Sequence, residues 1–343
     1  MKLVLRLIII GILFCLLGAI AYYWWWHHLA HSVNQTISAL IEDQRQQDYI
    51  IAFRAISING FPGPLQITLN NPVIVANRGG PAPLTYWRWD GPTLHGWINV
   101  LAPREITFTA TGLHKIDSVL GRTPQNLRLD AQNLTFVLKL DNNGHLQTID
   151  MAARLVKGTI IETETEFTIE NFTNHIENRK PVLISGYIRG GILNHEIAPG
   201  LGNILNDARW QMKIFEDFPT TGGAAGISLW QHKGGRIEVE DFSARAPSLE
   251  VNLQGPIALD EQLQPYAQFT GWMRGWGVLL QSLVANGSMS PSGSALANLA
   301  LRALARPPAE GGPPAVHAPL SLRNRRVFLG PVNLGTVPPI HWE

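Results

Sequence analysis

The sequence predicts a mainly β protein of the α+β class, in which a transmembrane helix and a helical stalk precede a large curved antiparallel sheet packed with a few helices. Three observations predict it. Residues 7–26 carry no charge, and apolar and polar residues then alternate over many short runs. Glycine (32) and proline (23) separate these runs. Alternation with frequent turns is typical of an antiparallel sheet with one buried and one solvated face.

Composition bounds the function before any motif is considered. The 343 residues suffice for one large domain or two modest ones. The net charge is +1, so no overall field attracts nucleic acid. Cys15, the one cysteine of the sequence, lies in the apolar N-terminal segment. The body therefore has no disulfide, no cysteine zinc site and no cysteine nucleophile.

The first expected element is a transmembrane helix over residues 7–26, which as a helix would span about 30 Å. Lys2 and Arg6 favour a cytoplasmic N-terminus over residues 1–6. We therefore expect a single-pass protein of an inner membrane with a periplasmic body. An alternative is a signal peptide cleaved after Ala21, because Ala19-Ile20-Ala21 fits a cleavage site.

An aromatic run closes this segment. Aromatic rings with a polar edge settle at the headgroup level of a bilayer. The residues predicted to lie at this membrane interface are Tyr22, Tyr23, Trp24, Trp25 and Trp26.

A helical stalk is predicted next, over residues 27–48, where apolar residues from Leu29 to Ile41 recur at helical spacing. Residues 49–343 then form the expected β-rich domain. Asp141-Asn142-Asn143-Gly144 predicts a hairpin turn within it.

Two helical regions interrupt the β pattern of the body. A helical hairpin is expected at about residues 271–305, and a short helix near Leu201–Trp210. A flexible Pro/Gly loop follows the hairpin over residues 306–319.

Gly60-Phe61-Pro62 predicts a structural turn, since glycine permits a tight bend and proline fixes the next φ. With its flanks it reads AISINGFPGPLQITLNNPVIV, and later segments read YWRWDGPTLHGW, GRIEVEDFSARAPSLEVNLQG and LSLRNRRVFLGPVNLGTVPPIHW. Together these segments resemble the DUF2125 family of alphaproteobacterial envelope proteins. Gly63 departs from the family pattern, which has a large apolar residue there. More loosely, the strand-dense segments resemble AsmA/TamB-type proteins, and that resemblance implies lipid handling without catalytic residues.

Several side chains are candidates for a binding or catalytic site. A possible apolar ligand surface comprises Trp87, Trp89, Trp97, Trp272 and Trp276, against the alternative of ordinary core. Polar candidates are His27, His28 and His31 for a metal, Glu162, Glu164 and Glu166 for acid–base chemistry, and Arg323, Arg325 and Arg326 for phosphate headgroups. Interfacial or solvated surface positions explain these polar residues more simply.

These observations predict a membrane-anchored protein without enzymatic activity or cofactor, which binds or guides a lipid-like molecule. Its expected partners are the lipid bilayer, a lipid-like ligand and other envelope proteins, and not nucleic acid. One alternative is a structural or interaction subunit without a ligand. A further alternative is a hydrolase with scattered residues such as His195 and Glu196.

Overall fold

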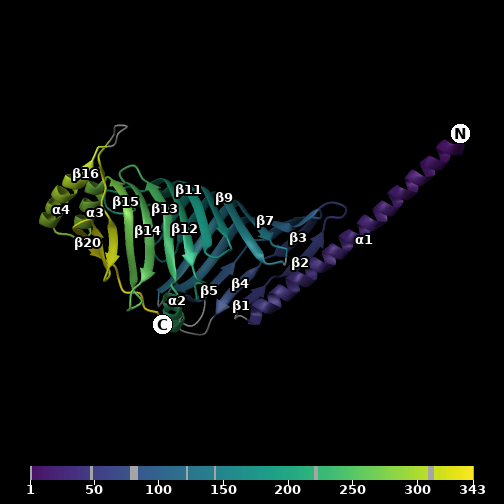
Figure 1. The fold of residues 1–343 in the computed structure, drawn as a ribbon, viewed down its shortest axis with the longest axis horizontal. Coiled ribbons are helices and arrows are strands. Elements are labelled where there is room, and N and C mark those ends of the chain that lie inside the picture. Colours follow the sequence, from purple (N-terminus) through teal and green to yellow (C-terminus); the bar gives the residue numbers. More distant parts are fainter. Residues whose placement is uncertain are drawn as a thin grey trace.

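A long N-terminal helix leads into a large antiparallel sheet (Figure 1). The computed structural model of the chain describes residues 2–46, 49–77, 84–120, 123–142, 144–219, 223–307 and 313–342. Its helices are α1 (Lys2–Gln46), α2 (Gly223–His232), α3 (Trp276–Ala285) and α4 (Pro291–Leu304).

The strands form one open antiparallel sheet, which confirms the predicted mainly β architecture. They are β1 (Tyr49–Ala52), β2 (Ala55–Asn59), β3 (Leu65–Asn70), β4 (Val73–Asn77), β5 (Leu84–Asp90), β6 (Leu94–Asn99), β7 (Ala102–Leu120), β8 (Thr123–Leu140), β9 (Leu146–Ile160), β10 (Thr165–Glu177), β11 (Val182–Leu193), β12 (Ile204–Phe215), β13 (Arg236–Arg245), β14 (Glu250–Leu259), β15 (Pro265–Arg274), β16 (Ala305–Arg306), β17 (Ala315–Val316), β18 (Leu320–Arg323), β19 (Arg326–Leu329) and β20 (Val332–Thr336).

Strands β7 to β14 each pair with the next strand in the chain. The long strand β7 pairs with β6 along its first half and with β5 along its second half. Two short branches therefore join the same strand, one through β6, β3 and β2 and the other through β5, β4 and β1. At the other end, β15 pairs with β17 and β18, and β18 leads through β19 to β20.

The pairing register gives the sheet two chemically different faces. Residues directly opposite each other on neighbouring strands point to the same face, and successive residues of a strand alternate between faces. One row of paired residues reads Leu65, Ile98, Ile106, Leu138, Ile149, Ile176, Ile184, Met212 and Val239. We call the face that carries this row the apolar face. The opposite face, called the polar face, carries the row Thr107, Val137, Asp150, His175, Ser185 and Gln211.

Helices cover the apolar face at both ends of the sheet. At the N-terminal end, Trp26 of α1 joins Leu65, Ile67, Ile98 and Val100 in a buried cluster. At the C-terminal end, α3 and α4 pack on strand residues around Met273 and Val316, and the buried helix residues there are Trp276, Leu280, Ala297 and Leu301. Figure 1 shows α1 at one end of the sheet, and α3 and α4 at the other.

Local sequence explains where helix α4 begins and where the chain turns after strand β8. The Ser290 hydroxyl accepts a hydrogen bond from the Gly293 N–H at 3.1 Å, which caps α4, and Pro291 occupies its first turn. At the turn predicted after β8, the Gly144 N–H donates to the Asp141 carbonyl at 3.2 Å. Asn143 of that turn lies outside the described residues.

The structure overturns the membrane prediction. Among the helices of the described ranges, none has the length and apolar character needed to cross a membrane. The transmembrane helix over 7–26, and with it the inner-membrane location and periplasmic body, is therefore wrong. Helix α1 continues past the aromatic run to Gln46, and its Trp26 packs on the sheet.

Two further helix assignments differ from expectation. The short helix near Leu201–Trp210 is wrong, because strand β12 starts at Ile204 and pairs with β11 and β13. Helix α2, by contrast, was not predicted from the sequence. Its Ile227 and Trp230 are buried at one edge of the sheet.

Candidate functional site

The candidate site is the part of the apolar face that lies between the two helix-covered ends. We call this part the middle segment; it spans β8 to β13. The buried cluster found there contains strand residues alone, namely Ala131, Ala153 and Val156, with Leu129, Leu134, Ile169 and Phe172 packed around them. Within the described chain, no helix contributes to this cluster, whereas a helix contributes to each of the other two.

Val156 and Val239 of the middle segment are buried, but its larger apolar side chains are half-buried. They are Phe136, Leu138, Ile149, Met151, Phe172, Ile176, Ile184, Ile188, Trp210, Met212 and Phe242. None of them is among the exposed large apolar side chains. Neighbouring side chains thus shield one another, but they leave apolar surface in contact with water. Covering that surface with an apolar group removes it from water, which is favourable.

Trp210 and Asn174 show how a polar group is tolerated here. The Trp210 Nε1–H donates a hydrogen bond to the Asn174 Oδ1 at 3.2 Å. Gly186 lies between the two residues in the register, and a Cβ placed on it would come within 2.2 Å of the Trp210 ring. A glycine is needed there because the indole occupies the space of a side chain. The amide oxygen thereby has a partner within the apolar surface.

A second polar group of the apolar face lies on β7, where His114 pairs with Leu129. The Trp89 Nε1–H donates to the His114 Nδ1 at 3.3 Å, and the two rings stack with centroids 5.9 Å apart. His114 is only 2% exposed. Burial lowers its pKa from the ordinary value, which the charge of Asp130 partly opposes. The ring is therefore neutral near pH 7.

Charges gather on the polar face. Along one register row, Asp207, Arg245, Glu250 and Arg274 alternate in sign across four strands. Their ion pairs measure 3.8 Å for Arg245–Asp207, 3.3 Å for Arg245–Glu250 and 2.7 Å for Arg274–Glu250. Cross-strand pairs of this kind keep one face solvated, so the two faces differ sharply in what they can bind.

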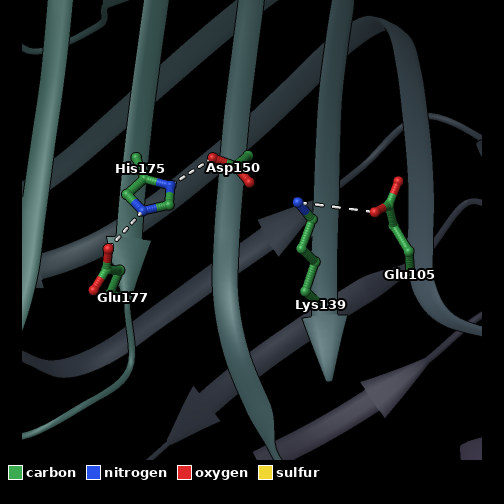
Figure 2. Close-up of polar contacts among 5 residues, drawn as sticks. All are labelled: Glu105, Lys139, Asp150, His175 and Glu177. Carbon is green, nitrogen blue, oxygen red and sulfur yellow. Dashed lines mark hydrogen bonds and ion pairs between the residues drawn. The ribbon is translucent and has the colours of Figure 1, made fainter. Parts of the chain in front are cut away.

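An imidazole between two carboxylates stands out on the polar face. Figure 2 shows His175 of β10 with Asp150 of β9 on one side and Glu177 on the other. The His175 Nδ1 lies 2.5 Å from the Asp150 Oδ1, and its Nε2 lies 3.5 Å from the Glu177 Oε1. The hydrogen bond to Asp150 raises the pKa of His175, and Glu177 adds to the effect. The cluster therefore favours a protonated imidazole.

A cavity of about 510 Å³ lies beside this cluster and is lined by Asp150, His175, Ser185, Arg209 and Asp241 among others. Ser185 faces His175 in the register, but the imidazole nitrogens contact the two carboxylates. The arrangement holds a proton and does not activate a hydroxyl. In the described part of the chain, no group of three or more His, Cys, Asp or Glu side chains is arranged so that it could hold a metal ion.

The five candidate tryptophans do not form one surface. Register places Trp87 and Trp89 on the apolar face, because Trp89 pairs with Ile116. Trp97 pairs with Thr107, and Trp272 with Asn252, so both lie on the polar face. Trp276, the first residue of α3, is buried in the cluster that α3 and α4 form with the sheet. Trp210, which the sequence interpretation did not select, lies in the middle segment.

The aromatic run of α1 packs on the turn Gly60-Phe61-Pro62. The Tyr22 hydroxyl donates to the Pro62 carbonyl, and the Trp26 Nε1–H donates to the Gly63 carbonyl at 2.9 Å. The Phe61 ring lies 5.4 Å from Tyr23 and 5.6 Å from Trp26. Trp24 and Trp25 are exposed. Turn and helix thus fasten one another at the N-terminal end of the sheet.

The remaining polar candidates have local partners. His27 stacks on Phe61, Trp24 stacks on His28, and His31 contacts Gln35. The Glu162 carboxylate accepts from the Asn126 N–H, and Glu164 and Glu166 are exposed. Arg323 lies over the Phe328 ring, and Arg325 and Arg326 are exposed. His195 contacts Thr165 at 2.9 Å, while the Glu196 carboxylate accepts from the Gly200 N–H, so they do not converge on one site.

Comparison with known proteins identifies the family. Residues 26–338 match the family described as uncharacterized protein conserved in bacteria (DUF2125). The chain belongs to the DUF2125 family. No curated protein and no solved structure matches it. The function proposed for this DUF2125 chain therefore rests on the geometry of its sheet.

Proposed function

We propose that this protein binds a molecule with a long apolar chain, such as a lipid, along the middle segment of its apolar face. The observation that carries the proposal is the half-buried apolar surface of β8 to β13, whose buried cluster of strand residues receives no helix residue in the described part of the chain. The looser resemblance to AsmA/TamB-type proteins supports a lipid-like ligand. The proposed role is binding or guiding such a molecule rather than transforming it.

Polarity favours an apolar chain over a polar ligand. The rows of the middle segment contain Asn174 as a polar side chain, and its amide oxygen already accepts from Trp210. The backbone N–H and C=O groups of these strands bond to their neighbours in the ladders. A ligand there meets little that hydrogen-bonds, so burial of apolar surface supplies the affinity.

Shape favours a thin chain over a protein helix. A helix with side chains is roughly 10–12 Å across, and docking one calls for apolar side chains that stand clear of their neighbours. The large side chains of the middle segment are instead shielded by one another to more than half of their area. A flexible hydrocarbon chain fits between half-buried side chains that a helix does not reach.

The test compares the two faces of one strand. Ile184 lies in the middle segment, and Ser185, the next residue of β11, lies on the polar face. An amide placed on the apolar face makes less contact with the hydrocarbon chain of the ligand than isoleucine does. The amide must also lose its water when the ligand binds. We expect Ile184→Asn to weaken binding of palmitate to the full chain about tenfold or more. The matched variant Ser185→Asn should bind palmitate as the natural chain does.

Two measurements decide the outcome. Titration calorimetry gives the affinities, and mass spectrometry of an organic extract of the detergent-free protein reports any co-purified lipid. Circular dichroism shows whether each variant is folded, and Ile184→Ala replaces Ile184→Asn if it is not. Absence of palmitate binding and of any extracted lipid would contradict the proposal. Crosslinking to a stable protein partner in its place would favour an interaction subunit.

A further inference from the structure

Buried polar atoms without a partner point to a second element of this site. In the described residues these atoms are the His114 Nε2, the Thr148 Oγ1, the Ser243 Oγ and the Arg274 Nε. Register places Thr148, Ser243 and Arg274 on the polar face, since they pair with Lys139, Arg209 and Glu250. His114 is the exception, because it lies on the apolar face opposite Leu129.

The hydrogen-bond pattern fixes what His114 offers. An indole N–H can only donate, so the His114 Nδ1 that receives the Trp89 N–H must be an acceptor. In a neutral imidazole the other nitrogen then carries the hydrogen. The Nε2–H is consequently a donor, it is buried, and it has no acceptor. Native proteins leave few such groups unpaired, and each requires an explanation.

His114 borders the middle segment directly. Its register partner Leu129 packs on the cluster of Ala131, Ala153 and Val156. Beyond Leu129 the same row continues through Gly158 and Phe167. A ligand chain that lies along the middle segment toward β7 would therefore end beside the residue that carries this buried donor.

We propose that His114 recognises the polar end of the ligand, its Nε2–H donating a hydrogen bond to an oxygen acceptor joined to the apolar chain. The acceptor is the carboxylate of a fatty acid or the carbonyl of an acyl ester. This inference rests on the proposed function, because His114 has no ligand to orient unless a chain occupies the middle segment. A cationic head lacks an acceptor and gains nothing from this donor.

The experiment compares three amphiphiles on the full chain by titration calorimetry. They are palmitate, methyl palmitate and hexadecyltrimethylammonium, the last used below its micelle concentration. We expect the natural chain to prefer at least one of the two acceptor-bearing probes about tenfold over the cation, as one hydrogen bond to a buried donor provides. Preference for palmitate alone identifies a free acid, and equal affinity for palmitate and methyl palmitate identifies an acyl carbonyl.

The variant His114→Phe keeps an aromatic ring and removes the donor. We expect it to bind all three probes with similar affinity. The control is His95→Phe, which changes an exposed histidine of β6 that pairs with Thr109 on the polar face, and which should keep the preference. Nitrogen NMR of the natural chain labelled at histidine gives an independent readout, because palmitate should shift the His114 Nε2 signal, whether or not His114→Phe folds.

The outcomes separate the two proposals. If the natural chain binds none of the three probes, the proposed function fails. If it binds all three equally, the role of His114 is overturned. The same holds if His114→Phe keeps the preference for acceptor-bearing probes. In both cases the proposed binding of an apolar chain stands. An Nε2 signal that does not move on palmitate binding also contradicts the role of His114.

Discussion

One register row crosses both the covered and the uncovered part of the apolar face. At the N-terminal end, Leu65 and Ile98 are fully buried under α1. Two strands beyond Ile98, the row continues through Leu138, Ile149 and Ile176, which are half-buried. The residue types are the same in both regions. What differs is the presence of a helix, so it is the helix, and not the strand pattern, that decides where the sheet has a finished core.

This difference gives the ends and the middle separate roles. The ends bury apolar surface within the chain and therefore stabilise the fold. The middle leaves apolar surface in contact with water, which costs stability, and this is the surface on which the proposed ligand would lie. A sheet that had to be stable alone would gain from a helix over β8 to β13.

The largest expected effect concerns the N-terminal end. Trp26 is 4% exposed, packs on Leu65 and Ile67, and donates to the Gly63 carbonyl. We expect Trp26→Ala to lower the free energy of unfolding by about 4 kcal/mol. The matched control is Trp24→Ala on the same helix, where the side chain is 67% exposed, and it should change stability by less than about 0.5 kcal/mol. Urea unfolding measures both, and equal losses would contradict the packing of α1 on the sheet.

A pair of leucines tests the comparison itself. Leu301 of α4 is 0% exposed, whereas Leu138 belongs to the middle segment. We expect Leu301→Ala to cost about 3 kcal/mol of unfolding free energy, and Leu138→Ala about 1 kcal/mol, because Leu138 leaves part of its surface in water.

Added palmitate sharpens this comparison. A bound chain covers Leu138 but does not reach Leu301, so saturating palmitate should increase the cost of Leu138→Ala and leave that of Leu301→Ala unchanged. Thermal unfolding with and without palmitate measures the change. Equal costs for the two leucines in the absence of palmitate would show that the middle is packed like the ends.

Sequence patterns predicted the sheet but not the site. Alternation over segments such as Leu134–Leu140 identifies a strand with one apolar face, because the side-chain period of a strand is two. The same alternation does not tell whether a helix covers that face. The predicted transmembrane helix was wrong because no helix of the described residues is long and apolar enough to cross a membrane. An apolar run also does not reveal that its Tyr22 and Trp26 have partners in a turn about 40 residues later.

The polar contacts could not be predicted from the sequence for another reason. His114 and Trp89 are 25 residues apart, and so are His175 and Asp150. Pairing register brings each couple together, and register depends on the turns and bulges of every strand between them. No local motif marks either histidine.

The smallest expected effect concerns the polar face, where solvent screens charges. His175 is 39% exposed, and its hydrogen bond to Asp150 raises its pKa above the ordinary value of 6.5. The folded chain therefore binds the proton more tightly than the unfolded chain does. The stability that results is fully present below about pH 6.5 and is lost as pH rises through the raised pKa.

Replacing the imidazole tests this sign. His175→Gln should be less stable than the natural chain by under 1 kcal/mol at about pH 5.5, and the difference should vanish at about pH 9. Chemical unfolding at the two pH values measures it, and added salt should shrink the difference at the lower pH, because the charges of Asp150 and Glu177 act through partly exposed contacts. A difference that grows with pH would mean that the carboxylates do not hold a protonated His175. The cluster of His175, Asp150 and Glu177 would then contribute no stability to the polar face, and the proposal for the apolar face would be unaffected.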